Sequence, residues 1–193
     1  MSEGRLILGL DISPRNCGFY LLSVTLEEAF SQYVDLGPSD LKNSAEALQR
    51  LFSSLISFGV GKRIILAVLE GYAYNSFLSR EISGERGGLA KFTVSRFLDS
   101  SPIPLITVAP RAVKSFISGD GGSKTDKSVV METLKSNWGL PFETDHEADA
   151  GVLALMGVFS VRPNKMLSLN QSRIISTLQD RFSEELNYAL RTS

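Results

Sequence analysis

The run RIILAVLE at residues 63–70 constrains the fold of this chain more than any other segment. Its apolar residues follow one another almost without interruption and include several β-branched ones, as is typical of a strand that other elements cover on both faces. Such a strand belongs in the interior of a sheet with helices on each side. The run ends in Glu70, so the sequence also predicts a carboxylate at the end of a buried strand.

Shorter patterns around this strand predict the rest of the sheet and its helices. Apolar runs at 5–12 and 17–24 flank the turn-forming sequence SPRN, which predicts two antiparallel strands. Further strands are expected at 30–36 and 105–109. Residues at helical spacing predict helices at 39–58, 87–98, 109–117, 124–137 and 145–159, with a mobile loop from 71 to 86. This order of elements fits an α/β fold with a mixed sheet and helices on both faces.

The length of 193 residues and the hydrophobic content of 43% allow one substantial core, with room for an appendage. We expect one domain over residues 1–162. After Pro163 the composition becomes polar, and residues 163–193 are predicted to form a C-terminal helical extension with one amphipathic helix. Its apolar stripe could pack on the domain or lengthen a dimer interface, and the sequence does not choose between them. The stripe consists of Ile174, Leu178, Phe182, Leu186 and Leu190.

Cysteine usage and the N-terminus favour a reducing compartment. The single cysteine, Cys17, cannot form an internal disulfide, and the sequence MSEGR lacks the apolar stretch of a signal peptide. No run approaches the roughly 18 apolar residues that a membrane-spanning helix requires. We therefore expect a soluble, cytoplasmic protein without a membrane partner.

The charge of the chain leaves nucleic-acid binding open. A formal net charge of −1 lacks the basic excess that such proteins usually show. The segment 111–135 is weakly basic, which a solvated helix face explains as well as a DNA contact does. Its basic residues are Arg111, Lys114, Lys124, Lys127 and Lys135, against the acidic Asp120, Asp126 and Glu132.

Two acids follow apolar strands in the same way. Asp11 ends the first predicted strand and Glu70 ends the most apolar one. In open α/β sheets ligands bind at the carboxyl ends of strands. Two carboxylates on neighbouring strands repel each other unless something positive lies between them. Oxygen ligands suit Mg²⁺ or Mn²⁺, which can activate water at a phosphodiester. Taken alone, Asp11 could also simply be an acid that leaves the core at a turn.

A third acidic group opens the predicted helix at 145–159. Residues three or four positions apart share a helix face, so His146 or Asp145 can stand beside Asp149, whereas Glu147 points elsewhere. Asp145 is also a natural N-cap. His146 is the only histidine, and a lone histidine is often structural. The identity of a fourth ligand therefore stays open between His146 and Asp145.

Together these segments resemble the RuvC-type Holliday-junction resolvases, in order and spacing, across roughly residues 5–160. The matching motifs are ILGLDIS with Asn16 and Gly18, VLEGYAYN, HEADAGVLAL and the linking segment VAPRAVKSFISGDGGSKTDK. The resemblance implies a ribonuclease H-like five-stranded mixed sheet flanked by helices on both faces. It also implies a homodimeric endonuclease that cuts two strands of a four-way DNA junction symmetrically, with Mg²⁺ or Mn²⁺ held by four side chains.

The resemblance carries over residue by residue. Asp11, Glu70 and Asp149 match three of the family's metal-binding acids, and His146 falls on the remaining position, with Asp145 as the competing candidate. Candidate DNA-binding residues lie in two segments: the basic residues Arg111, Lys114, Lys124 and Lys127, and the aromatic residues Tyr72 and Tyr74. The aromatic pair lies where the family stacks a ring on an unpaired junction base. Weaker candidates for the same cleft are Arg80, Arg86 and Lys91.

Other functions fit parts of the same pattern. A strand ending in GLDIS also resembles the phosphate-binding loop of actin-like and sugar-kinase ATPases, but those proteins need about twice this length, because they duplicate the domain. A nuclease acting on flaps, forks or RNA–DNA hybrids, or a protein that binds branched DNA without cutting it, keeps the fold and changes the role. The complete set of acids argues against a loss of catalysis.

Overall fold

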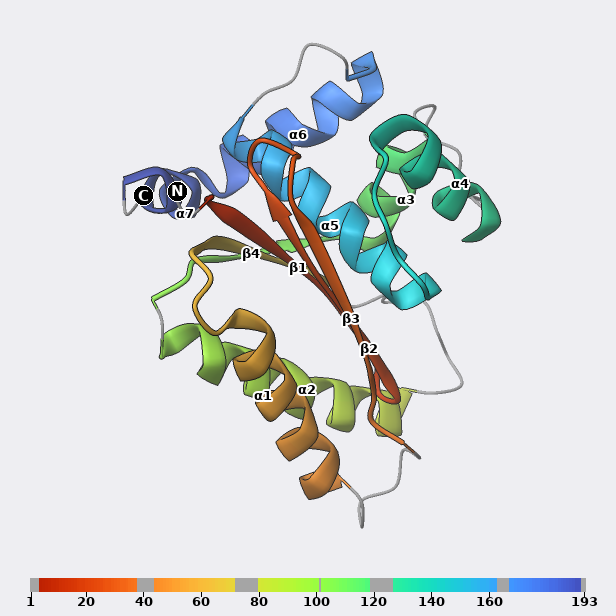
Figure 1. Cartoon of the computed structure of the whole chain (residues 1–193), viewed down its shortest axis with the longest axis vertical. Helices are drawn as coiled ribbons and strands as arrows, with labels where there is room; N and C mark the ends of the chain where they lie inside the picture. Colours follow the sequence, from red (N-terminus) through yellow and green to blue (C-terminus); the bar gives the residue numbers. More distant parts are fainter. Residues whose placement is uncertain are drawn as a thin grey trace.

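The computed structural model describes residues 4–37, 44–71, 80–100, 102–118, 127–162 and 167–191, and it places one five-stranded sheet at the centre (Figure 1). The strands are β1 (Leu6–Ile12), β2 (Asn16–Ser23), β3 (Ala29–Asp35), β4 (Ile64–Glu70) and β5 (Leu105–Val108), and their order is β3-β2-β1-β4-β5. β1, β2 and β3 pair antiparallel, whereas β4 runs parallel to both β1 and β5. The predicted mixed sheet is therefore confirmed.

Helices cover both faces of this sheet. The helices α1 (Ser44–Gly59) and α2 (Arg80–Asp99) lie on one face, and α5 (Asp145–Val161) crosses the other (Figure 1). Beside α5 lie α3 (Pro110–Ser118), α4 (Lys127–Trp138), α6 (Leu169–Arg181) and α7 (Ser183–Arg191). Each face has its own apolar core. Leu8 and Leu10 belong to the core under α1 and α2, while Ile7 and Val68 belong to the core around α5.

Helix α5 packs unusually close to β1 and β2, because glycines leave space for its backbone. A Cβ atom on Gly9 would overlap the carbonyl group of Ala150, and one on Gly18 would overlap the carbonyl group of His146. These two glycines allow the N-terminal half of α5 to lie directly against the sheet. The side chains at the start of α5 are thereby brought to the end of β1.

The helix α2 differs from the sequence prediction at its beginning. It starts at Arg80, so the predicted loop is wrong for residues 80–86. The glycines Gly84, Gly87 and Gly88 lower helix propensity by about 1 kcal/mol each relative to alanine. Tertiary packing outweighs this cost, because Ala90 and Val94 are fully buried against the sheet.

The C-terminal segment also differs, because it forms two helices instead of one. The break lies at Phe182, whose backbone angles of φ −119° and ψ 34° end α6. Helix α7 then contacts β4 and α5. The apolar stripe packs on the domain, since Leu178, Phe182 and Leu186 are buried in the core around α5. No helix in the described ranges has the length and apolar character needed to cross a membrane.

Candidate active site

The register of the sheet places four site positions in one row across neighbouring strands. Asp11 pairs with Gly18 of β2, and Gly18 pairs with Tyr33 of β3. On the other side, Leu10 pairs with Leu69 of β4, so that Glu70 follows beside Asp11. Since paired residues of neighbouring strands share a face, Asp11, Glu70 and Tyr33 all face α5. The sequence prediction that the two strand-ending acids lie together is consistent with this row.

The start of α5 is fixed by a capping box. Thr144 is the N-cap, and its hydroxyl accepts a hydrogen bond from the Glu147 backbone N–H. The Glu147 carboxylate in turn accepts hydrogen bonds from the backbone N–H groups of Glu143 (3.0 Å) and Thr144 (2.8 Å). The interpretation of Asp145 as the N-cap is therefore wrong. Glu147 is buried and holds the helix end, away from the acids of the site.

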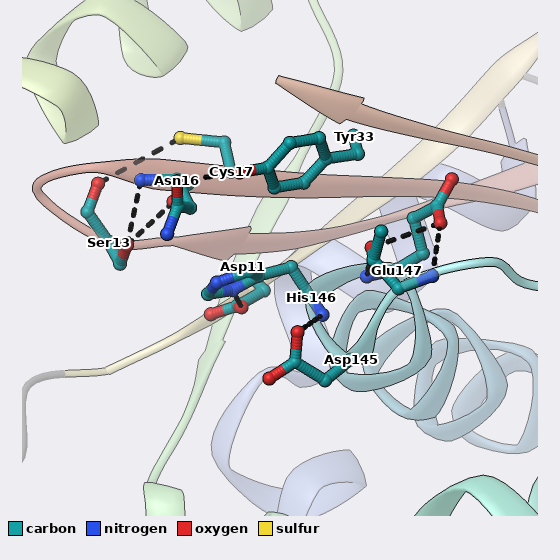
Figure 2. A network of polar contacts seen from close by, with 9 residues as sticks. Asp11, Ser13, Asn16, Cys17, Tyr33, Asp145, His146 and Glu147 are labelled. Carbon is teal, nitrogen blue, oxygen red and sulfur yellow. Dashed lines mark hydrogen bonds and ion pairs between the residues drawn. The ribbon is translucent and has the colours of Figure 1, made fainter. Parts of the chain in front are cut away.

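His146 contacts Asp11 directly. Its Nδ1 atom lies 2.7 Å from Oδ2 of Asp11, and both side chains are largely buried, with 19% and 11% of their surfaces exposed (Figure 2). A carboxylate only accepts hydrogen bonds, so Nδ1 carries the hydrogen and donates it. In the neutral ring Nε2 then carries the lone pair. Asp145 accepts a hydrogen bond of 3.1 Å at Oδ1 from the His146 backbone N–H.

Glu70 is the most strongly perturbed acid of the site. Its pKa is raised from 4.5 to about 7, first by burial and then by the negative charges of Asp11 and Asp149, while Lys114 and Lys91 act in the opposite direction. Burial also lowers the pKa of Lys91, an effect that Glu70 partly offsets. The structure thus brings Glu70 within electrostatic range of two other acids and two lysines. A partly buried carboxylate with a raised pKa marks a candidate functional site.

A pocket of about 350 Å³ opens beside these acids. Three of its lining residues are charged, namely Glu70, Lys114 and Asp149. The rest of the lining is mostly apolar and comes from α3, α4 and α5: Pro110, Val113, Ile117, Val130, Val152 and Leu153, with Gly71 after β4. Asp11 and His146 lie outside this lining. The site therefore has one part around Asp11 and His146 and another around the pocket.

The donor set fits the chemistry of a divalent cation. Three carboxylates repel one another strongly enough to help raise the pKa of Glu70, and a bound cation would relieve that repulsion. Within the described ranges, however, no three His, Cys, Asp or Glu side chains are grouped as a metal site in their present positions. The metal-ligand set of Asp11, Glu70, Asp149 and either His146 or Asp145 stays a prediction.

The structure describes only some of the predicted DNA-binding residues. Lys114 and Arg111 are exposed on α3, and Lys114 borders the pocket. Lys127 begins α4, but its side chain lies outside the described part of the chain, as do Tyr72, Tyr74 and Lys124. The side chains of Arg80 and Arg86 on α2 also lie outside it.

Tyr33 is a further residue of the site that no sequence pattern predicts. Its ring stacks on the His146 ring, with centroids 6.0 Å apart and planes inclined by 26°. Nothing in the local sequence marks this tyrosine, because its proximity to His146 depends on the pairing of β3 with β2. Asn16, which belongs to the first sequence motif, accepts a hydrogen bond of 2.7 Å from the Tyr33 hydroxyl.

This chain resembles known proteins in its structure but not in its overall sequence. No protein-family model matches the sequence, and no curated protein matches it. Thermus thermophilus RuvC matches with a TM-score of 0.64 and 18% identity, over 80% of this chain and 95% of that one. T. thermophilus RuvC in complex with a Holliday junction substrate gives a TM-score of 0.63 and 17% identity, over 80% and 94% of the two chains.

A third solved structure extends the match to the C-terminal helices. The yeast mitochondrial Holliday junction resolvase Ydc2 covers 99% of this chain and 85% of its own, with a TM-score of 0.53 and 14% identity. All three structures are similar to this chain in fold and distant from it in sequence. This chain has the ribonuclease H-like α/β fold of the RuvC-type resolvases.

Proposed function

We propose that this protein is a metal-dependent endonuclease that resolves four-way DNA junctions. The observation that carries the proposal is the gathering of Asp11 and Asp149 around the partly buried Glu70, within electrostatic range of its carboxyl group, in a fold shared with RuvC. One similar structure is a RuvC bound to a Holliday junction substrate, and another is a mitochondrial Holliday junction resolvase. Carboxylates at strand ends in this fold suit phosphodiester hydrolysis.

The metal would be Mg²⁺ or Mn²⁺, held by Asp11, Glu70 and Asp149 with His146 or Asp145. When bound, such an ion supplies activation of water and stabilisation of charge at the phosphate. The two oxygens of the Asp11 carboxylate would have different partners. Oδ2 accepts the hydrogen bond from His146, and Oδ1 would be the oxygen that binds the ion. The exposed Lys114 at the pocket is suited to contact a phosphate.

DNA binding would extend from Lys114 along the basic segment of the chain. Arg111 lies exposed on the same helix, and Lys124 and Lys127 follow it in sequence. Tyr72 and Tyr74 follow Glu70 directly and are proposed to stack on an unpaired base of the junction. Each such stack is worth roughly 1 to 3 kcal/mol of binding free energy.

A homodimer would provide the two active sites that paired, symmetric nicks require. Helix α2 carries two exposed apolar side chains, Leu89 at 42% and Phe92 at 64% exposure. The two residues are three positions apart and so share one face of the helix, and a contiguous apolar patch is typical of a surface that another protein covers. We therefore propose α2 as part of the interface between two copies of this chain.

Cleavage of synthetic DNA tests the function. With Mg²⁺ or Mn²⁺ the protein is expected to nick four-way junctions at paired, symmetric positions. Asp11→Asn and Glu70→Gln should abolish cutting and retain junction binding, because they remove charge from the site without removing the fold. Asp180→Asn is a matched control, since it removes an exposed acid from α6.

The substrate panel decides between related activities. It should include linear duplex, flaps, forks and RNA–DNA hybrids beside the four-way junction. Equal cutting of linear duplex would contradict junction resolution, and a preference for flaps or forks would assign the same chemistry to another branched DNA. Tight junction binding without nicks at any metal concentration would indicate a non-cleaving binding protein.

A further inference from the structure

Tyr33 links the edge strand β3 to the centre of the candidate active site. Its ring stacks on the His146 imidazole, with centroids 6.0 Å apart and an angle of 26° between the planes. Its hydroxyl donates a hydrogen bond of 2.7 Å to Oδ1 of Asn16. The residue is 39% exposed, so burial in a core does not account for its position.

The residue that anchors Tyr33 is itself held in a tight turn. The Asn16 backbone N–H donates to the Ser13 hydroxyl at 3.0 Å, and that hydroxyl donates to the Asn16 carbonyl at 2.7 Å (Figure 2). The Ser13 backbone N–H donates to the same carbonyl at 3.0 Å. Three hydrogen bonds therefore fix the turn between β1 and β2, and the Tyr33 hydroxyl is bound to a rigid support.

The sheet register explains why His146 meets both Asp11 and Tyr33. Gly18 lies between these two residues in the row across β1, β2 and β3. Since Gly18 has no Cβ, the backbone of His146 can pack directly against it. The hydrogen bond holds Nδ1 of the His146 ring at Asp11, and the stacking contact holds the face of the ring against Tyr33.

We propose that Tyr33 is a positioning residue of the active site, whose ring keeps the His146 imidazole on Asp11 with Nδ1 as the donor. A hydrogen bond at Nδ1 alone leaves the ring able to tilt about that bond, whereas a tethered aromatic ring on its flat side restrains the tilt. Partners that orient an active-site histidine typically contribute roughly 10- to 100-fold to activity or metal affinity. The role of the His146 imidazole in cleavage rests on the proposed function, whereas the positioning of the imidazole by Tyr33 does not.

The spectrum of His146 tests the placement without any cleavage assay. His146 is the only histidine of the chain, so labelled histidine gives one imidazole signal set. In the metal-free full-length protein we expect the Nδ1–H tautomer and ring-proton shifts displaced by the Tyr33 ring. Tyr33→Leu should remove that displacement and mix the tautomers, and Tyr33→Phe, which keeps the ring and loses the tether, should give an intermediate change.

Phe30→Leu is the matched control. Phe30 lies on the same strand as Tyr33 and is 43% exposed. Because it is three residues away from Tyr33, its side chain lies on the opposite face of the sheet. There its ring contacts the Lys62 ammonium group, with 4.5 Å between the ring centroid and Nζ. The His146 signals should be unchanged in this variant. Signals that stay unchanged in Tyr33→Leu would overturn the proposal, whatever the cleavage rate.

Cleavage provides the second measurement. With saturating protein and Mg²⁺, Tyr33→Leu should slow single-turnover cleavage of a four-way junction by roughly 10- to 100-fold, with unchanged junction affinity. The proposal would be overturned if Tyr33→Leu cleaved the junction at the wild-type rate. It would also be overturned if the variant bound the junction more weakly but cleaved bound junctions at the wild-type rate. If the wild-type protein cuts no junction, the proposed function fails, while the histidine spectrum still decides the role of Tyr33.

Discussion

At the scale of single residues, Glu70 couples the stability of the protein to pH. The folded state holds its pKa at about 7, above the ordinary value of 4.5, so folding favours the protonated carboxyl. Below pH 4.5 the group is neutral in both states and costs nothing. As the pH rises from 4.5 to about 7 the metal-free folded protein loses stability, and the loss is complete at pH 8, where it is on the order of 1 to 3 kcal/mol.

Glu70→Gln removes this cost. Its free energy of unfolding should exceed that of the metal-free wild type at pH 8, and the difference should disappear near pH 4, as measured by urea denaturation across the pH range. Added Mg²⁺ should raise the Tm of the wild type more than that of the variant, because the ion binds the folded state through the carboxylate. A difference that is constant with pH would contradict the raised pKa of Glu70.

At the scale of elements, the docking of α5 on β2 depends on Gly18. A Cβ atom there meets the His146 backbone, and a backbone neighbour cannot turn aside as a flexible side chain can. Gly18→Ala should therefore shift the start of α5 and destabilise the protein by roughly 1 to 3 kcal/mol. The loss of junction cleavage should be larger than this destabilisation explains, since His146 and Asp149 move together.

Gly4→Ala is the control for this prediction. A Cβ atom on Gly4 lies at an ordinary contact distance of 3.6 Å from Glu28, so neither stability nor cleavage should change. The two variants are compared by thermal unfolding and by single-turnover cleavage at a temperature at which both are folded. Wild-type cleavage by Gly18→Ala would show that the close approach of α5 is not needed.

At the scale of the whole molecule, the C-terminal helices belong to the core around α5. Leu178 of α6 is 6% exposed within that core, whereas Leu169 of the same helix is 82% exposed. Leu178→Ala should lower the free energy of unfolding by about 2 to 5 kcal/mol in one cooperative transition. Leu169→Ala should leave it unchanged.

The same measurement tests the division of the chain at residue 162. If residues 163–193 were an independent extension, Leu178→Ala would produce a separate early transition and leave the main one at its wild-type position. Urea denaturation followed by tryptophan fluorescence is suited to this test, because Trp138 packs on Phe159 of α5 at a centroid distance of 5.1 Å. It therefore reports on the core that α6 joins.

The sequence by itself determined the strands and most of the helices, and it placed the candidate acids Asp11 and Glu70 at strand ends and Asp149 on a helix. These follow from local patterns, since an apolar run or a helical period is set by residues near one another in the chain. The same local reasoning failed at residues 80–86 and at Phe182. At the first site burial outweighed the low helix propensity of glycine, and at the second the chain broke so that α7 could reach β4.

Only the tertiary structure decided which side chains meet. The pairing of Asp11 with Gly18 and of Gly18 with Tyr33 is a matter of strand register, and the contact of His146 with Asp11 joins residues 135 positions apart. The raised pKa of Glu70 likewise needs burial and two distant acids. Register and burial arise from the packing of whole elements, so no local pattern contains them, and Tyr33 could be found only after the sheet was assembled.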